Sequence, residues 1–433
     1  MKTYAICGIS TRAIAQFIMP LVGNPNLPLL GNFTKYGKVV AILDADSERV
    51  KAFNSKQGTN FPFYSPDEFD KMIAETNPDV VVVTCIDVMH SEYIVKGLQH
   101  DRDVITEKPM VINGRQARAV MDAEKKSKGC VRVAFNYRYT PAHKQIKRMV
   151  LDGMLGKITN VEFNYLLDTY HGSSYFARWN RSRELSGGLT VTKACHHFDL
   201  VNWWLGDFPE SVFAFGARNY YGSGSPTDPN PKNGSPLPVT EQKAACPYWQ
   251  RWNARNMQAP QDDHLNVYEA AYSLPTKLQY PKPLYFYDKE IGIEDTYSAV
   301  VRYRNGASMS YSLNASAPWE GYILAINGTK GRLETTHYTA PSRCPFPASE
   351  RQTITYLPLF GERQIWDTRQ VEGGHGGADQ VMKWDMFVEP SKESEELNIY
   401  AGAEAGAYSV AVGEAVWRSA VEKKQIEIKE LLG

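Results

Sequence analysis

Residues 4–13 read Tyr4-Ala5-Ile6-Cys7-Gly8-Ile9-Ser10-Thr11-Arg12-Ala13. The stretch is apolar up to Gly8, which predicts a buried strand, and apolar residues at helical spacing continue to residue 22. Further apolar runs alternate with helical patterns up to about residue 135, and they predict strands over residues 39–43, 79–84, 104–106 and 131–135. Because these runs are apolar throughout, they are typical of a parallel sheet that helices cover on both faces through right-handed βαβ units.

The pattern changes after about residue 150, where polar and apolar residues alternate. Alternation is clear over residues 158–166, and again over residues 298–303 and 307–313, which flank an Asn-Gly turn at Asn305. Two alternating runs joined by Asn-Gly are the strongest short-range signal of a hairpin, so the second half is expected to contain an antiparallel sheet.

Two segments interrupt these patterns. Residues 23–37, rich in Asn, Pro and Gly, are longer than an ordinary helix-to-strand loop and are interpreted as a surface insertion. In residues 222–238, 8 of 17 residues are Gly or Pro, which favours an excursion from the core. This excursion is taken to extend over about residues 222–290.

The composition of the 433 residues is that of an ordinary globular chain. Lysine and arginine number 48, as do aspartate and glutamate, so the net charge gives no general attraction to nucleic acid or anionic lipid. No apolar run approaches the roughly 18 residues of a membrane span, and no secretory signal is recognised. The six cysteines are scattered without Cys-x-x-Cys, which excludes a zinc ribbon and favours a reducing compartment. We therefore expect a cytoplasmic protein with no nucleic-acid or membrane partner.

The turn at Gly8 is compatible with a dinucleotide-binding loop, whose fingerprint is Gly-x-Gly-x-x-Gly/Ala after a first strand. Gly8 and Ala13 match this fingerprint, whereas Ser10 departs where the backbone must approach the pyrophosphate. A plain strand–turn–helix is the alternative. Asp44 follows the second predicted strand, where a carboxylate accepts both ribose hydroxyls and repels a 2′-phosphate; a helix N-cap is its alternative role. Together the two features favour NAD over NADP.

A second polar pattern places Lys108 after the strand predicted at residues 104–106, at the sheet edge where open α/β sheets bind ligands. A surface Lys–Glu pair before Pro109 is the alternative. Helix N-terminal amides and Arg12 are expected to hold a pyrophosphate. The residues expected to bind the cofactor are Gly8, Ser10, Thr11, Arg12, Asp44, Thr84, His90, Glu107 and Lys108.

A third pattern follows the glycines at residues 187 and 188. If a helix starts near Lys193, then Lys193, His196 and Trp203 share one face of it. A cation, an imidazole and an indole on one stripe are poor material for a core. The pattern therefore favours a functional role over a buried structural helix.

Taken in order, these pieces resemble the glucose–fructose oxidoreductase / inositol dehydrogenase (Gfo/Idh/MocA) family. The matching pieces are Glu107-Lys108-Pro109, Gly187-Gly188, His196 with Asp199, Asn136-Tyr137-Arg138-Tyr139 with Pro141, residues 328–334 and residues 373–379. The resemblance implies an NAD-binding Rossmann domain over residues 1–135. It also implies a C-terminal α/β domain over residues 136–433, with a large, mostly antiparallel sheet that binds substrate and builds a homodimer or homotetramer.

The same resemblance implies NAD(P)-dependent oxidation of a ring hydroxyl of a sugar, glycoside or cyclitol. Lys108 would orient this hydroxyl and stabilise the alkoxide, and His196 would be the general base because its ordinary pKa of about 6.5 lies near working pH. The aspartate that inositol dehydrogenases carry four residues before the histidine is Thr192 here. Lys193 is the candidate to replace it, since a neighbouring cation would lower the pKa of a lysine.

Residues 168–181 mix aromatic and hydrogen-bonding side chains, which suits the apolar faces and hydroxyl fringe of a sugar ring. A loop that folds its aromatics into a domain interface is the alternative. The substrate candidates are His171, Arg178, Trp179, His197 and His375, although His197 faces away on a helix, which favours a structural role. Adjacent histidines diverge on a helix, so no metal site is expected.

Two other functions remain open at this point. One is redox-assisted glycoside cleavage, in which transient oxidation activates a neighbouring C–H bond for elimination and bound NADH then restores the alcohol. The other is a non-catalytic sensor of a sugar or dinucleotide, which the departures at Ser10 and Thr192 favour. Lys108 and His196 favour an enzyme, because a sensor needs no proton relay.

Overall fold

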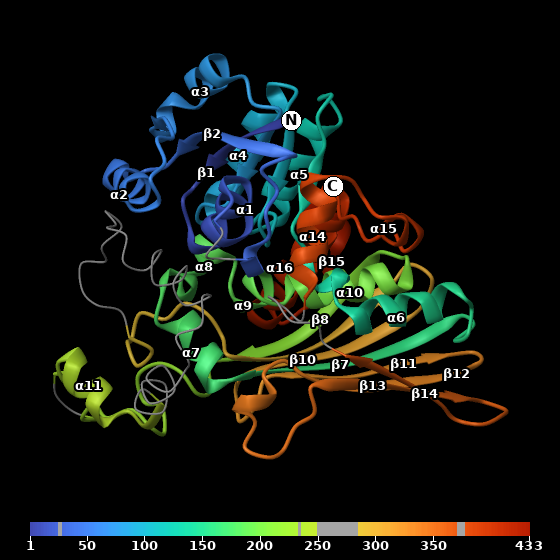
Figure 1. Ribbon diagram of the computed structural model, residues 1–433. Coiled ribbons are helices and arrows are strands. Elements are labelled where there is room, and N and C mark those ends of the chain that lie inside the picture. The colour runs from blue at the N-terminus through green and yellow to red at the C-terminus, as the bar shows by residue number, and fades with distance from the viewer. Residues whose placement is uncertain (25–27, 233–234, 249–284, 370–376) are drawn as a thin grey trace. The chain divides into compact units, whose positions relative to one another are not determined.

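The computed structural model describes residues 1–24, 28–232, 235–248, 285–369 and 377–433 (Figure 1). The chain divides into two compact units. The first unit contains Met1–Thr140 and the described part of Val371–Val410. The second contains the described parts of Pro141–Pro260 and Tyr280–Gln370, together with Ala411–Gly433. The domain boundary at residue 135 stays a prediction; in the structure the described part of Val371–Val410 packs with the first unit.

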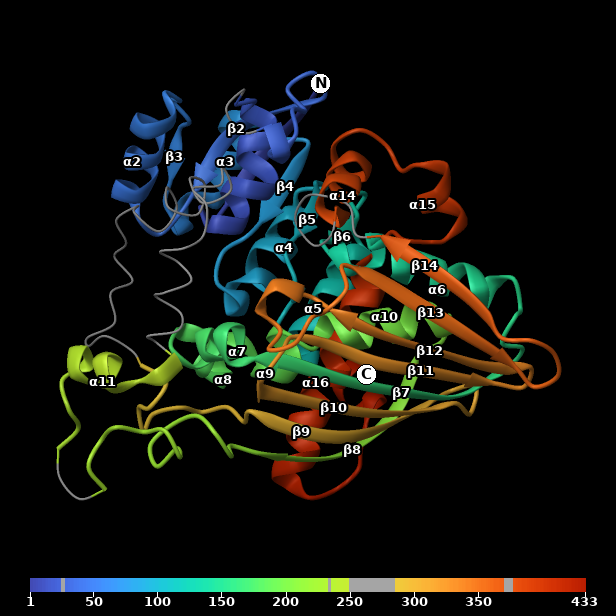
Figure 2. The ribbon, with the colours of Figure 1, turned by 60° about the horizontal axis from the view of Figure 1, so that its bottom comes forward.

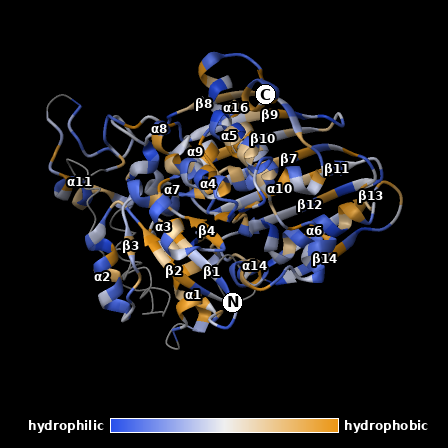
Figure 3. Cartoon of the chain, turned by 90° about the horizontal axis from the view of Figure 1, so that it is seen from above, coloured by the Kyte–Doolittle hydropathy of each residue, from blue (hydrophilic) through white to orange (hydrophobic). Residues whose placement is uncertain are grey.

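The first unit is built on a six-stranded sheet in the order β3-β2-β1-β4-β5-β6, and every neighbouring pair is parallel. Its strands are β1 (Lys2–Cys7), β2 (Gly37–Leu43), β3 (Phe63–Tyr64), β4 (Val80–Val83), β5 (Asp103–Thr106) and β6 (Val131–Val133). All four valines of β4 are buried, and Figure 3 shows β4 as strongly hydrophobic. This order and burial confirm the predicted Rossmann-type sheet.

Helices cover the sheet of the first unit. They are α1 (Met19–Val22), α2 (Ser47–Gln57), α3 (Phe69–Thr76), α4 (His90–Gln99), α5 (Gly114–Glu124), α14 (Ala378–Phe387), α15 (Lys392–Glu396) and the beginning of α16 (Ala403–Glu422). Asn113 caps α5, since its side chain accepts a hydrogen bond from the Gln116 amide at 2.9 Å.

The insertion at residues 23–37 is not merely a surface loop. In its described part, Leu30 and Phe33 are buried, and the Phe33 ring lies 5.3 Å from that of Phe387 on α14. Lys383 of α14 donates a hydrogen bond to the Leu30 carbonyl at 2.6 Å. The prediction missed this packing because α14 follows more than 300 residues later in the chain.

The second unit is built on a nine-stranded sheet in the order β14-β13-β12-β11-β7-β10-β9-β8-β15 (Figure 2). Its strands are β7 (Ile158–Asp168), β8 (Pro209–Ala217), β9 (Thr296–Tyr303), β10 (Ser308–Ala317), β11 (Gly321–Gly328), β12 (Gly331–Tyr338), β13 (Arg351–Pro358), β14 (Gln364–Arg369) and β15 (Ile426–Glu427). Only β7 and β10 pair in parallel; the other pairs are antiparallel. This confirms the predicted large, mostly antiparallel sheet.

Among the described residues, helices cover one face of this sheet and leave the other open. The helices of this unit are α6 (Pro141–Leu151), α7 (Thr169–Phe176), α8 (Arg183–Ser186), α9 (Leu189–Thr192), α10 (Cys195–Leu205), α11 (Val239–Ala245), α17 (Ile428–Leu432) and the end of α16. Figure 2 shows α6 and α10 along one face. On the opposite face Phe215, Val300 and Ile323 are exposed.

The predicted excursion at residues 222–290 contains core residues where it is described. Tyr221, just before it, stacks on Phe176 with 4.1 Å between ring centroids and donates a hydrogen bond to the Ala315 carbonyl at 2.8 Å. Cys246 and Tyr285 are also buried. The Gly- and Pro-rich part itself is an excursion as predicted, since none of residues 223–232 and 235–238 is buried. The buried aromatic residues lie before and after it and pack against the end of the sheet. Much of the rest, residues 249–284, lies outside the described residues.

No described helix combines the length and the apolar character that crossing a bilayer requires.

Candidate functional site

The first unit brings three predicted cofactor residues to one edge of its sheet. β1 pairs with both β2 and β4, and Cys7 lies opposite Leu43 and Val83. Gly8, Asp44 and Thr84 are the next residues of these three strands, so they lie together at the carboxyl edge. Open α/β sheets bind dinucleotides at this edge.

Gly8 is required by the geometry of the turn. Its φ is +98°, a left-handed conformation that favours glycine, and a Cβ there would lie 2.5 Å from the Cα of Cys85. The Thr84 hydroxyl donates a hydrogen bond to the Gly8 carbonyl at 2.6 Å, which fixes the turn. Ser10 caps the following helical turn, since its hydroxyl accepts from the Ala13 amide at 3.1 Å. The residue that departs from the fingerprint thus has a local structural role.

Asp44 organises the same turn. Its two carboxylate oxygens accept from the Ile9 amide at 2.8 Å and the Asp46 amide at 2.9 Å. The N-cap of α2 is Asp46, so the capping alternative for Asp44 is wrong. Burial raises the pKa of Asp44, and the two backbone hydrogen bonds oppose that rise. Each oxygen retains a second lone pair for a ligand hydroxyl.

Arg12 joins the turn to the Glu-Lys-Pro segment. Its Nε donates to Glu107 at 2.9 Å, and its guanidinium lies 3.5 Å from Asp379 on α14. Asn136 donates to the other oxygen of Asp379 at 2.8 Å. Two carboxylates therefore hold this cation beside the glycine turn.

His90 holds the same segment from the other side. Its Nδ1 lies 2.9 Å from the Pro109 carbonyl and its Nε2 lies 3.2 Å from the Cys85 carbonyl. The ring is buried, which lowers the pKa of His90. His90 thus connects the turn after β4 to the backbone next to Lys108. His90 is therefore placed to orient this segment. Lys108 follows β5 at the same sheet edge.

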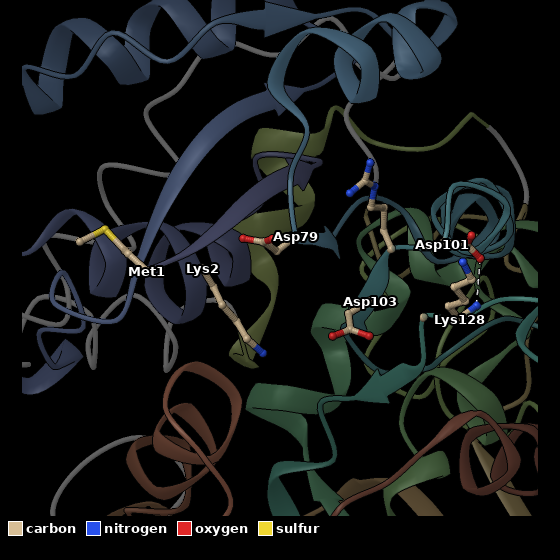
Figure 4. A pocket seen from close by; sticks show the side chains of 8 residues that line it. Met1, Lys2, Asp79, Asp101, Asp103 and Lys128 are labelled. Carbon is tan, nitrogen blue, oxygen red and sulfur yellow. Dashed lines mark hydrogen bonds between the residues drawn. The ribbon is translucent and has the colours of Figure 1, made fainter.

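These residues fit a dinucleotide. A tight glycine turn, a carboxylate after the second strand and a cation near a helix start are the groups that such a cofactor needs. A different pocket of the first unit lies at the amino ends of the strands, where Lys2, Asp79, Asp103 and Lys128 are among its lining residues (Figure 4). That edge is the wrong one for a cofactor in a parallel sheet.

The second unit positions the pattern predicted around Lys193. Gly187 and Gly188 have φ of +74° and +85° and separate α8 from α9. A helix starting near Lys193 was predicted, and α10 begins at Cys195, two residues later, while Lys193 itself is the C-cap of α9. The His196 amide donates to the Lys193 carbonyl at 3.4 Å, so one turn joins the two residues.

The substrate candidates differ in their surroundings. His197 is buried, stacks on Tyr165 at 3.9 Å and forms a hydrogen bond with the Tyr311 hydroxyl at 2.8 Å, which favours its structural interpretation. Arg178 is exposed and donates to Ser174 at 3.0 Å. Trp179 begins a short helical turn and is half-buried. His375 lies outside the described residues.

The prediction missed a carboxylate at the centre of this region. Glu320, which precedes β11, is 2% exposed. One oxygen lies 2.9 Å from Nδ1 of His171 and 3.6 Å from Nζ of Lys193, and the other accepts from Arg343 at 2.5 Å. Arg343 also donates to Asp168, the last residue of β7, at 2.6 Å. We call these five residues the Glu320 cluster.

Charge governs the protonation of this cluster. Burial opposes ionisation of Glu320, but His171, Lys193 and Arg343 hold its pKa well below the usual range. Burial lowers the pKa of His171, and Glu320 opposes that shift. At neutral pH the cluster therefore combines an ionised carboxylate with a neutral imidazole. No motif marks Glu320 or Arg343 in the sequence, and β11, which follows Glu320, is an apolar run rather than an alternating strand.

Comparisons with known proteins agree with this architecture. The family described as "Oxidoreductase family, NAD-binding Rossmann fold" matches residues 2–135, and "Oxidoreductase family, C-terminal alpha/beta domain" matches residues 147–428. "Putative oxidoreductase YteT" of Bacillus subtilis (strain 168) is 48% identical over 437 residues, which cover 100% of this chain and 99% of that protein.

More distant matches include a levoglucosan dehydrogenase of Pseudarthrobacter phenanthrenivorans. It is 27% identical over 145 residues, 33% of this chain and 37% of that protein. Among solved structures, a levoglucosan dehydrogenase in complex with NADH and levoglucosan has a TM-score of 0.64 at 17% identity, covering 99% of both chains. The aldose-aldose oxidoreductase from Caulobacter crescentus has a TM-score of 0.61 at 17% identity and covers 98% of this chain and 99% of that chain. These structures share the fold.

Proposed function

Because the chain belongs to the Gfo/Idh/MocA oxidoreductase family, we propose that it oxidises a ring hydroxyl of a sugar, glycoside or cyclitol with NAD. The observation that carries this proposal is one sheet edge. There β2, β1, β4 and β5 are neighbours, and Asp44, Gly8, Thr84 and Lys108 follow them at their carboxyl ends. The polar Glu320 cluster of the second unit supplies groups suited to a hydroxylated substrate.

The choice of NAD over NADP rests on Asp44. Its carboxylate lies where the adenosine ribose binds in this fold, and it would repel a 2′-phosphate. Arg49 helps to hold the same turn, since its Nε donates to the Ile9 carbonyl at 2.9 Å. The proposal therefore gives NAD the higher affinity.

Lys108 is proposed to donate a hydrogen bond to the substrate oxygen and to stabilise the alkoxide as it forms. The nicotinamide ring, when bound, accepts the hydride from the substrate carbon. Lys193 is buried and its Nζ lies 3.6 Å from Glu320, so it is proposed to hold this carboxylate in place. His196 remains the family-based candidate for the base.

Relatives support the substrate class. Their names include levoglucosan dehydrogenase and inositol 2-dehydrogenase, whose substrates carry ring hydroxyls. The open face of the nine-stranded sheet is proposed to form a homodimer or homotetramer, which light scattering after gel filtration would test. The cytoplasmic location remains a prediction from the sparse cysteines, none of which forms a disulfide in the structure.

A substrate panel tests the function. Purified protein with NAD is incubated with hexoses, disaccharides, aminosugars and inositols, and NADH absorbance is followed. Formation of NADH with at least one class is expected, and its absence with every class counts against the proposal. Turnover of chromogenic glycosides without net NADH would instead indicate redox-assisted cleavage.

A further inference from the structure

We propose that His171, oriented by Glu320, accepts the proton of the substrate hydroxyl. This inference rests on the proposed dehydrogenase function and assigns to His171 a role that the sequence patterns suggested for His196 or Lys193. Glu320 and Arg343 are then positioning residues, because they act through His171 rather than on the substrate.

The first step of the argument is the tautomer of His171. An ionised carboxylate only accepts hydrogen bonds, so the 2.9 Å contact with Glu320 requires Nδ1 to carry a hydrogen. The neutral ring then has an unprotonated Nε2. Among the described residues Nε2 has no hydrogen-bond partner, and the His171 side chain is 36% exposed. The ring therefore presents a lone pair to solvent or substrate.

The second step is the rigidity of the carboxylate. Glu320 is held by Arg343 on one oxygen, while Tyr165 donates to the other at 3.3 Å. Asp168 fixes the start of α7 by accepting from the His171 amide at 2.8 Å. The backbone and the ring of His171 are thus both anchored. Such a carboxylate–imidazole pair sets the ring orientation and stabilises the imidazolium that proton uptake creates.

The third step concerns the charges that face the imidazole. Glu320 favours its protonation, whereas Lys193 and Arg343 disfavour it, and burial lowers its pKa. The Tyr175 ring, 5.4 Å away on the same helix, adds no charge. The result is a ring that is neutral at pH 7 but has a carboxylate ready to stabilise its charged form.

The alternatives are less accessible. His196 is 3% exposed and Lys193 is buried beside Glu320. A base must reach the hydroxyl within hydrogen-bond distance. Of these three side chains that of His171 is the most exposed, at 36%, so it meets this need most directly.

The reaction step balances as follows. The substrate O–H bond breaks and its proton moves to Nε2 of His171. The oxygen electron pair forms the C=O bond, and the C–H bond breaks as hydride transfers to the oxidised nicotinamide cofactor. The alcohol is oxidised to a ketone, NAD is reduced, and the imidazolium later releases its proton to water.

The pH dependence of kcat/KM tests the proposal. His171→Asn is expected to lower kcat/KM by about 10²- to 10⁴-fold, with NADH affinity unchanged. Glu320→Gln removes the group that raises the pKa of His171, so the acidic limb of the profile shifts to lower pH and the plateau falls at least about 10-fold. Glu320→Asp keeps a carboxylate, so its shift of the acidic limb and its fall of the plateau should both be smaller.

Glu294→Gln is the matched control, because Glu294 is also paired with an arginine, Arg183, at 2.7 Å in the same unit. It should leave the acidic limb in place. A plateau that falls in Glu320→Gln without a shift of the limb would indicate a merely structural role. Near-normal activity of His171→Asn, with His196→Asn inactive, would overturn the proposal while leaving the dehydrogenase function intact.

A measurement without substrate separates a failure of the orientation of His171 from a failure of the dehydrogenase function. Two-bond ¹H–¹⁵N spectra of protein labelled in histidine, assigned with His171→Asn, report the tautomer. A Nδ1–H form is expected for His171, and an Nε2–H form would refute the orientation by Glu320. If the substrate panel shows no turnover, the dehydrogenase function and the catalytic role of His171 fail together, and the tautomer result stands alone.

Discussion

The cofactor edge of the first unit and the Glu320 cluster of the second are assembled in different ways. The cofactor edge arises where consecutive strands end, so residues such as Gly8 and Thr84 are positioned by the local strand–turn–helix pattern. In the Glu320 cluster, His171, Glu320 and Arg343 come from three distant parts of the chain. A local motif identifies the first site, whereas only tertiary structure assembles the second.

The substitution with the largest expected effect lies in the Glu320 cluster. Glu320→Gln leaves the buried Lys193 and the partly buried Arg343 without their shared carboxylate. Removing one partner of a buried ion pair costs about 3–5 kcal/mol of unfolding free energy. The folded-state pKa of Glu320 is depressed, so its stabilisation is complete above the ordinary carboxyl pKa of about 4.3 and is lost as pH falls through the folded value.

Urea unfolding of the wild type and Glu320→Gln at a series of pH values measures this. The difference in unfolding free energy should be full at pH 7 and should shrink only in strongly acidic solution. A difference that is small at pH 7, or independent of pH, would show that Glu320 is not the centre of charge in the cluster.

The contrast between the two sites explains what the sequence could predict. The apolar runs before Gly8 and at residues 80–83 predicted the parallel sheet correctly, because buried parallel strands carry a local signal. Lys193 and His196 were recognised by a local helical pattern, and α10 begins two residues after Lys193. Glu320 carries no local signal, because its partners arrive from other strands and loops.

A second test concerns the catalytic group of the cofactor edge. Lys108→Ala is expected to lower kcat/KM by about 10²- to 10³-fold, because one donor to the developing alkoxide is lost. NADH affinity and the unfolding midpoint should change little. Steady-state kinetics with the best substrate of the panel measures the effect, and full activity would remove Lys108 from the mechanism.

A third test strains the local motif. Gly8→Ala adds a Cβ that would lie 2.5 Å from the Cα of Cys85, at a φ of +98°. The strain should cost about 1–3 kcal/mol of unfolding free energy and weaken NADH binding, since the turn must shift. Gly58→Ala is the control: its φ is +63°, but a Cβ there meets no atom within 4 Å. Equal effects of the two changes would mean that backbone conformation, rather than the contact with Cys85, limits this position.

The smallest expected effect concerns cofactor choice at Asp44. Asp44→Asn keeps an acceptor for the Ile9 amide but removes the negative charge, so NADH affinity should fall by about 10-fold while NADPH affinity rises or stays level. Fluorescence titration with both nucleotides measures the ratio. Asp46→Asn is the control, because Asp46 caps α2 and asparagine is an equally good N-cap. If both variants bind the two nucleotides as the wild type does, Asp44 serves only to hold the glycine turn, and the local motif specifies the fold of this edge without specifying its ligand.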